Sequence, residues 1–165
     1  MDTYLFIHVV LSFIGLFTRL VVMLNMLSGR HSAVWTLLFL LSTVLTSLTG
    51  FILPADKLLP SHIVGLLSLL VLGFAVHAYY IEKLQRRWRL IYAISATIAF
   101  YFNSFVAVVQ AFLKIPALYQ LAPTQTELPF VVAQTLLLLL FVIAGLLAAK
   151  RLPALAPSRM GMQHI

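Results

Sequence analysis

The sequence predicts an all-α protein, a polytopic membrane bundle of five transmembrane helices with the N-terminus outside and the C-terminus inside. The first observation is composition. Of the 165 residues, 62% are apolar and 9% are charged, whereas a soluble domain is about 45–50% apolar and about 25% charged. A chain of this size cannot bury so much apolar surface in one core. The composition therefore excludes a soluble globular enzyme, a disordered chain and a nucleic-acid-binding protein.

The second observation is that the apolar residues form five long stretches, each near the length of about 20 residues that a helix needs to cross a bilayer. The stretches are too long and unbroken for the alternating strands of a membrane barrel. In order, the expected spans are residues 4–27, 33–53, 61–81, 90–113 and 129–149. We expect residues 1–150 to form a single transmembrane domain and residues 151–165 to form a disordered cytoplasmic tail.

Turn-forming and charged residues separate these spans. The first span has no basic residue before it and is too long for the apolar region of a signal peptide, so we expect it to be retained. Ser28 and Gly29 then form a turn, and Ser61 is a suitable N-cap for the third span. The charged residues 82–89 follow the third span. The longest connection, residues 114–128, leads into the fifth span at a proline.

The third observation is the placement of the basic residues, which gives the orientation. Basic loop residues prefer the cytoplasm. Placing the first loop, the third loop and the C-terminus on one side gathers there Arg30, Lys83, Arg86, Arg87, Arg89, Lys150, Arg151 and Arg159. The opposite side holds only Lys57 and Lys114. The net charge of +7 is therefore mainly a topology signal.

Two spans carry a stripe of polar and small residues along one face. In the first, His8, Ser12, Gly15 and Arg19 follow one another at steps of four, three and four. No span contains an Asp or Glu in its core, so we expect Arg19 either to snorkel to the cytoplasmic surface or to anchor an anionic group. In the fourth span the stripe runs Tyr92, Ala96, Ala99, Asn103, Ala107, Gln110 and Lys114. It is either a packing seam or a ligand-lining face.

Depth in the membrane suggests a candidate site. With the topology above, polar residues of all five helices fall within about two turns of the outer surface, beneath the connection 114–128, whose length is typical of functional loops. We therefore predict an outward-facing polar pocket for a small or lipidic ligand, with Arg19 as a deeper anchor. Its expected lining is His8, His62, Asn103, Gln110, Lys114 and Gln134. The alternative is that these residues simply meet lipid headgroups.

A haem is the main alternative among cofactors. Imidazole is the usual axial ligand of a b-type haem, and His8 and His62 match in depth, while His77 lies nearer the inner side of the third span. A b-type cytochrome would use His8 with His62 or His77. A zinc or copper site between His8 and His62 lacks a carboxylate or thiolate to complete it. The chain has no cysteine, which excludes disulfides and iron–sulfur clusters.

Several segments also carry a family resemblance. The stretches Tyr101-Phe102-Asn103-Ser104-Phe105, Gln110-Ala111-Phe112-Leu113-Lys114-Ile115-Pro116 and Leu121-Ala122-Pro123-Thr124-Gln125 resemble small multi-pass bacterial inner-membrane proteins of unassigned activity. That resemblance implies a bacterial inner membrane. The first helix, with His8 followed by Gly15, faintly resembles that of HemJ-type protoporphyrinogen oxidases and copper-resistance D membrane proteins.

No motif of catalysis stands out, because phosphate-binding loops, dinucleotide fingerprints and metalloprotease motifs are all missing from the sequence. We therefore favour a carrier or accessory subunit over an enzyme. The expected partners are the lipid bilayer and either a second copy of the chain or another membrane protein, and we expect no nucleic acid.

Overall fold

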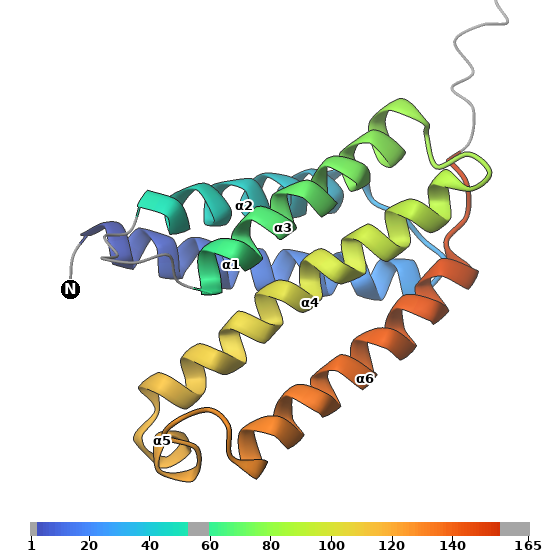
Figure 1. Cartoon of the computed structure of the whole chain (residues 1–165). Helices are drawn as coiled ribbons and strands as arrows, with labels where there is room; N and C mark the ends of the chain where they lie inside the picture. Colours follow the sequence, from blue (N-terminus) through green and yellow to red (C-terminus); the bar gives the residue numbers. More distant parts are fainter. Residues whose placement is uncertain (1–2, 53–59, 156–165) are drawn as a thin grey trace, which may run out of the picture.

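The computed structural model describes residues 3–52 and 60–155, and these residues form an all-helical bundle (Figure 1). The elements in order are α1 (Thr3–Leu27), α2 (Ala33–Ile52), α3 (Pro60–Val76), the π-helix η1 (His77–Ile81), α4 (Trp88–Lys114), α5 (Pro116–Leu121) and α6 (Leu128–Arg151). Within these described residues, five helices are long and apolar enough to cross a membrane, with α3 and η1 together making the third. They match the five predicted spans to within a few residues, as expected for a multi-pass membrane protein.

Consecutive long helices run antiparallel, and each packs on the next. α1 packs on α2, α2 on α3, α3 on α4 and α4 on α6, while α1 also touches α4 and α6. Small residues that are fully buried, such as Ala75, Ala93 and Ala99, let the helix backbones approach closely. The predicted packing seam on α4 is thus present at Ala96 and Ala99, which are also buried.

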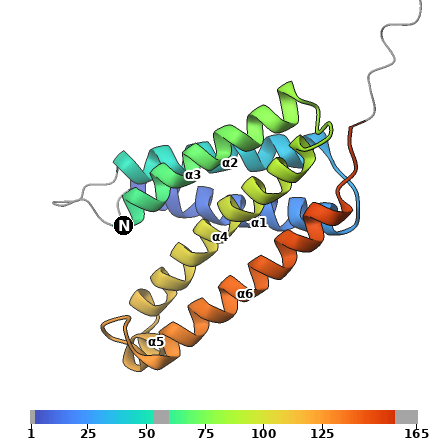
Figure 2. The ribbon, with the colours of Figure 1, turned by 45° about the vertical axis from the view of Figure 1, so that its right-hand side comes forward.

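The two antiparallel groups of helices diverge toward one end of the molecule. Figures 1 and 2 show α1, α2 and α3 side by side, while α4 and α6 form a hairpin that leans away from α1 toward the end where α5 lies. Among the described spans α6 is the least buried, since only Phe141 and Ala148 of its 24 residues are buried. Its leucine-rich surface therefore suits contact with lipid.

The opposite end of the bundle, which we call the basic end, carries most of the charge. Its described basic residues are Arg30, Lys83, Arg86, Arg87, Arg89, Lys150 and Arg151. Arg151 donates from Nη1 to the carbonyl of Leu27 over 2.8 Å and so ties the end of α6 to the end of α1. Gly29 adopts φ 65°, and a Cβ atom there would lie 3.2 Å from the Arg151 carbonyl oxygen. A glycine is therefore favoured in this turn by both conformation and space.

Two details differ from the sequence expectations. The long connection is partly helical, because Pro116 occupies the first turn of α5 and supplies the φ angle that a helix start requires. The expected tail begins in contact with the bundle: Leu152 is 1% exposed, and the carbonyl of Leu155 accepts a hydrogen bond from Gln85 Nε2 at 2.9 Å. Residues 156–165 of that tail lie outside the described residues.

A buried arginine beside an apolar groove

Arg19 is the most deeply buried charged residue among those described, with 2% of its surface exposed. Side chains on an α-helix lean toward its N-terminus. The guanidinium of Arg19 accordingly lies level with Gly15, where a Cβ atom would come within 2.8 Å of Nη1. It therefore points away from the basic end. The snorkelling interpretation of Arg19 is wrong, because the groups that receive its hydrogen bonds lie inside the bundle.

Two neighbouring helices supply those groups. Arg19 Nη2 donates to Thr43 Oγ1 on α2 at 2.8 Å. Asn103 on α4 faces both terminal nitrogens; since a guanidinium has only donors, the amide oxygen of Asn103 must face it, 2.9 Å from Nη2 and also accepting from Nη1. The cation lies 5.8 Å from the centre of the Phe39 ring. Arg19 thus joins α1 to α2 and α4.

A hydroxyl network orients the α2 side of this cluster. Thr43 Oγ1 donates to the carbonyl of Phe39 at 2.6 Å, so its lone pairs remain for Arg19. Ser42 Oγ donates to the same carbonyl at 3.0 Å and lies 3.2 Å from Thr18 Oγ1. The hydroxyls of Ser42 and Thr43 are therefore used to join α2 to α1 and to hold the acceptor of Arg19.

The hydrogen bonding of Arg19 is nevertheless incomplete. Its Nε has no hydrogen-bond partner although it is fully buried. Within the described residues the only acids are Glu82 and Glu127, and both lie outside the candidate spans. A guanidinium remains charged in proteins, and a buried charge is expensive unless an opposite charge compensates it. The cluster therefore consists of the Arg19 cation hydrogen-bonded to neutral groups, with the N–H of its Nε unpaired.

The other residues predicted to line the polar pocket lie apart from this cluster. His8 Nδ1 lies 2.9 Å from Thr49 Oγ1 at the α1–α2 interface. Gln134 Nε2 donates to the carbonyl of Phe105 at 3.3 Å, between α6 and α4. Gln110 and Lys114 are exposed. The side chain of His62 lies outside the described residues. Of the predicted residues whose side chains the structure describes, only Arg19 and Asn103 come together.

An apolar groove lies beside the Arg19–Asn103 pair, where α4 and α6 diverge from α1. Its volume is about 460 Å³, and it is lined by Phe13, Leu16, Phe17 and Leu20 of α1, Phe100, Ser104, Ala107 and Val108 of α4, and Leu137 of α6. Of these residues only Ala107 was predicted, as part of the polar and small stripe of the fourth span that could line a ligand. Sequence reasoning missed the others because lipid-facing and groove-lining apolar residues look alike in sequence.

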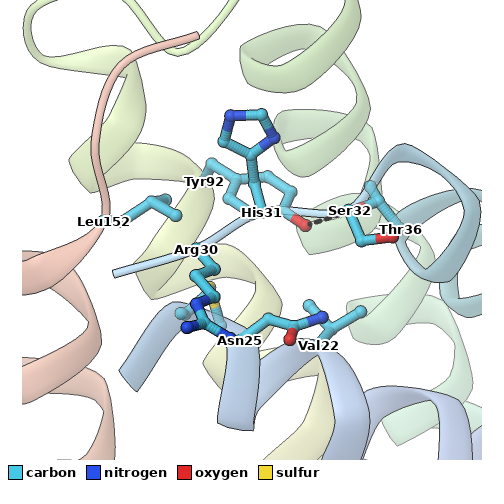
Figure 3. A pocket seen from close by; sticks show the side chains of 9 residues that line it. Val22, Asn25, Arg30, His31, Ser32, Thr36, Tyr92 and Leu152 are labelled. Atoms are coloured by element: carbon cyan, nitrogen blue, oxygen red, sulfur yellow. Dashed lines mark hydrogen bonds between the residues drawn. The ribbon is translucent and has the colours of Figure 1, made fainter. Parts of the chain in front are cut away.

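A second, much smaller cavity lies at the basic end (Figure 3). Its volume of about 10 Å³ is close to the space of one water molecule. It is surrounded by Val22, Asn25, Met26, Arg30, His31, Ser32, Thr36, Tyr92 and Leu152. Thr36 Oγ1 and Tyr92 OH lie 3.2 Å apart in its wall. The cavity is too small for an organic ligand.

The histidines considered as haem ligands are separated where the structure describes them. His8 shares a hydrogen bond with Thr49 through Nδ1, near the end of α1 that lies away from the basic end. His77 lies in η1 at the far end of α3, with its ring 4.8 Å from that of Trp88. One haem cannot join His8 to His77 across the length of the bundle. Among the described residues, no three His, Cys, Asp or Glu side chains gather into a metal site.

Comparison with family models, with curated proteins and with solved structures finds no match to this chain. The features of the molecule that bear on its function are the Arg19–Asn103 pair and the adjoining groove.

Proposed function

We propose that the chain is a multi-pass protein of the bacterial inner membrane that binds the apolar chain of a lipid-like molecule in the groove between α1, α4 and α6, as a carrier or accessory subunit. The groove itself is the observation that carries this proposal. It is about 460 Å³ in volume and lined almost wholly by apolar side chains, as ligand sites generally are. Phe13 and Phe17 at its edge are 69% and 58% exposed, so the groove is open to the surrounding bilayer.

The proposed orientation supports binding from the outer half of the membrane. The basic end would face the cytoplasm, and Lys114 is the only described Lys or Arg at the α5 end. The chain has no cysteine, so a single introduced cysteine can be labelled without background from native thiols. A maleimide that cannot cross membranes should label Gln120→Cys in α5 from outside and Gln85→Cys only after the cells are opened. The reverse pattern would overturn the orientation.

The test of the groove uses a neutral alkane that carries a photoreactive diazirine, added to the purified protein in detergent micelles. We expect saturable labelling, at one alkane for each chain, in the peptides that contain residues 13–20 and 100–108. Ala107→Trp places an indole in the groove and should remove most of this labelling. Ile143→Trp is the matched control, because Ile143 is 57% exposed on α6 and does not line the groove.

Two outcomes would contradict the proposal. Labelling that spreads over all exposed apolar faces and never saturates would show that the groove holds only bulk lipid or detergent. Labelling that survives Ala107→Trp but falls with Ile143→Trp would place the bound alkane on the outer face of α6 instead.

A further inference from the structure

We infer that the Arg19–Asn103 pair recognises the anionic head of the molecule whose chain lies in the groove, so that the ligand is an anionic amphiphile with a carboxylate or phosphate group. This inference rests on the proposed function and names the chemical class of its ligand. The guanidinium forms bidentate hydrogen bonds with both of these oxyanions. It is the one group near the groove with a fixed positive charge, among the residues that the structure describes.

Position is the first argument. On α1, Leu16 and Leu20 flank Arg19 in sequence and line the groove. On α4, Phe100 and Ala107 line the groove and lie about one helical turn on either side of Asn103. The Arg19–Asn103 pair therefore lies behind the residues that line the groove on α1 and α4. In the inferred complex, the head of an amphiphile whose chain fills the groove passes between these lining residues to Arg19.

The second argument is that Asn103 occupies the place of a carboxylate. Its amide oxygen accepts from both Nη1 and Nη2 of Arg19, as one oxygen of a bound carboxylate or phosphate would. Asn103 is half-buried, whereas Arg19 is fully buried. Rotation of the Asn103 side chain would free the acceptor position at both terminal nitrogens for an incoming anion, while Thr43 keeps its hydrogen bond to Nη2.

The third argument is the unmet donor capacity of Arg19. Nε lacks a partner, and the described spans offer no carboxylate. A purely structural polar contact between helices would need only neutral groups, at a lower desolvation cost than a guanidinium. A charge retained at this depth is better explained by an anion that arrives from outside the chain.

The test compares probes that share one chain and differ in the head. Hexadecanoate and hexadecyl phosphate, at about pH 8 where both are ionised, are each used to displace the photoreactive alkane, with neutral hexadecanol as the reference. We expect at least one anion to displace the alkane at a concentration about 10-fold or more below that of hexadecanol, because hydrogen bonds to charged groups are worth about that much in affinity. Preference for one anion over the other identifies the head as carboxylate or phosphate.

Three variants separate recognition from a structural role. Asn103→Ala uncovers the terminal nitrogens and should increase the preference for the anion. Asn103→Asp supplies a tethered carboxylate, so it should abolish the preference while displacement by hexadecanol is unchanged. Lys114→Gln is the control for general surface charge, because Lys114 is an exposed cation at the α5 end and its loss should leave the preference intact.

The possible failures are distinguishable. If hexadecanol and both anions displace the alkane equally, the inference about Arg19 is wrong, but binding in the groove stands. If none of the three displaces a saturable label, the proposed function falls as well. A preference that persists in Asn103→Asp, or that disappears in Lys114→Gln, would assign recognition of the anion to a group other than Arg19.

Discussion

Replacement of Thr43 by Val tests whether Arg19 holds α1 and α2 together. Thr43 is 0% exposed and its hydroxyl accepts from Arg19 Nη2 at 2.8 Å. Valine keeps nearly the same shape but leaves this N–H of the guanidinium unpaired. Net hydrogen bonds to charged groups contribute about 1.5–3 kcal/mol in water-soluble proteins, whereas side-chain hydrogen bonds inside membranes average about 0.6 and reach about 1.7 kcal/mol. We therefore expect Thr43→Val to lower the free energy of unfolding by about 1–2 kcal/mol.

The control for this variant is Thr135→Val on α6. Thr135 Oγ1 donates only to the carbonyl of Val131, at 2.8 Å, and is exposed. Thr43 makes the same kind of bond to the carbonyl of Phe39. The difference between the two variants therefore isolates the contact with Arg19, since both lose a hydroxyl that bonds to its own helix.

The assay is reversible unfolding in mixed micelles of a mild detergent and dodecyl sulfate, followed by circular dichroism. A double-mutant cycle with Arg19→Met completes it: once the guanidinium is gone, Thr43→Val should cost little more than Thr135→Val. Equal effects of Thr43→Val and Thr135→Val in the otherwise native chain would refute the reasoning. So would an unchanged effect of Thr43→Val in the Arg19→Met background.

Two further predictions concern helix packing and the loop before α6. A Cβ atom at Gly145 would lie 3.0 Å from Thr97 Cγ2, whereas a Cβ atom at Gly73 would meet nothing within 4 Å. We therefore expect Gly145→Leu to lower the free energy of unfolding by about 1–3 kcal/mol in the same assay. Gly73→Leu should leave it unchanged. Desolvation raises the pKa of the Glu127 carboxyl, but hydrogen bonds to the carboxylate outweigh this effect, so the pKa is lowered. The donors include the backbone amide of Glu127 and the amide and hydroxyl of Thr124. Because a depressed pKa stabilises the fold above the unfolded value and the benefit is lost as pH falls through the folded value, the protection of residues 124–127 against hydrogen exchange, taken relative to the intrinsic exchange rate at each pH, should fall on acidification.

Controls for these two predictions are available in the chain. If Gly145→Leu and Gly73→Leu behave alike, the close contact of α4 with α6 is not as described. Glu127→Gln removes the titrating carboxylate, so the protection of residues 124–127 in this variant should already be low at neutral pH and should change little on acidification. If residues 124–127 of Glu127→Gln still lose protection against exchange only at low pH, another titrating group causes the pH dependence.

The five spans were predictable from the sequence because the signal is local. A run of apolar residues long enough to cross the bilayer must satisfy its backbone hydrogen bonds internally, and a helix does so without help from the rest of the chain. The helix of residues 116–121 was missed because six residues carry no periodicity that could separate a helix from a turn. Pro116 was visible as a break, but not as the start of a further helix.

Which side chains come together at the candidate site could not be predicted from the sequence. The predicted topology placed His8, Gln110, Lys114 and Gln134 at one depth, but the direction in which each helix face points depends on helix rotation. The structure turns His8 toward Thr49 and Gln134 toward α4, and it leaves Gln110 and Lys114 exposed. The alternatives for Arg19 were snorkelling and an anchoring role, and side-chain direction within the bundle excludes the first.

The sequence by itself determined that this protein has five long apolar helices, where they begin and end, and that Arg19 has no acidic partner within the predicted spans. Hydrophobic length and charge placement suffice for these conclusions because they act on each segment separately. Only the tertiary structure decided that Arg19 meets Thr43 and Asn103, and that the α4–α6 hairpin leans away from α1 to leave the groove. Helix rotation and crossing are set by the fit of side chains over whole interfaces, and no single segment contains that information.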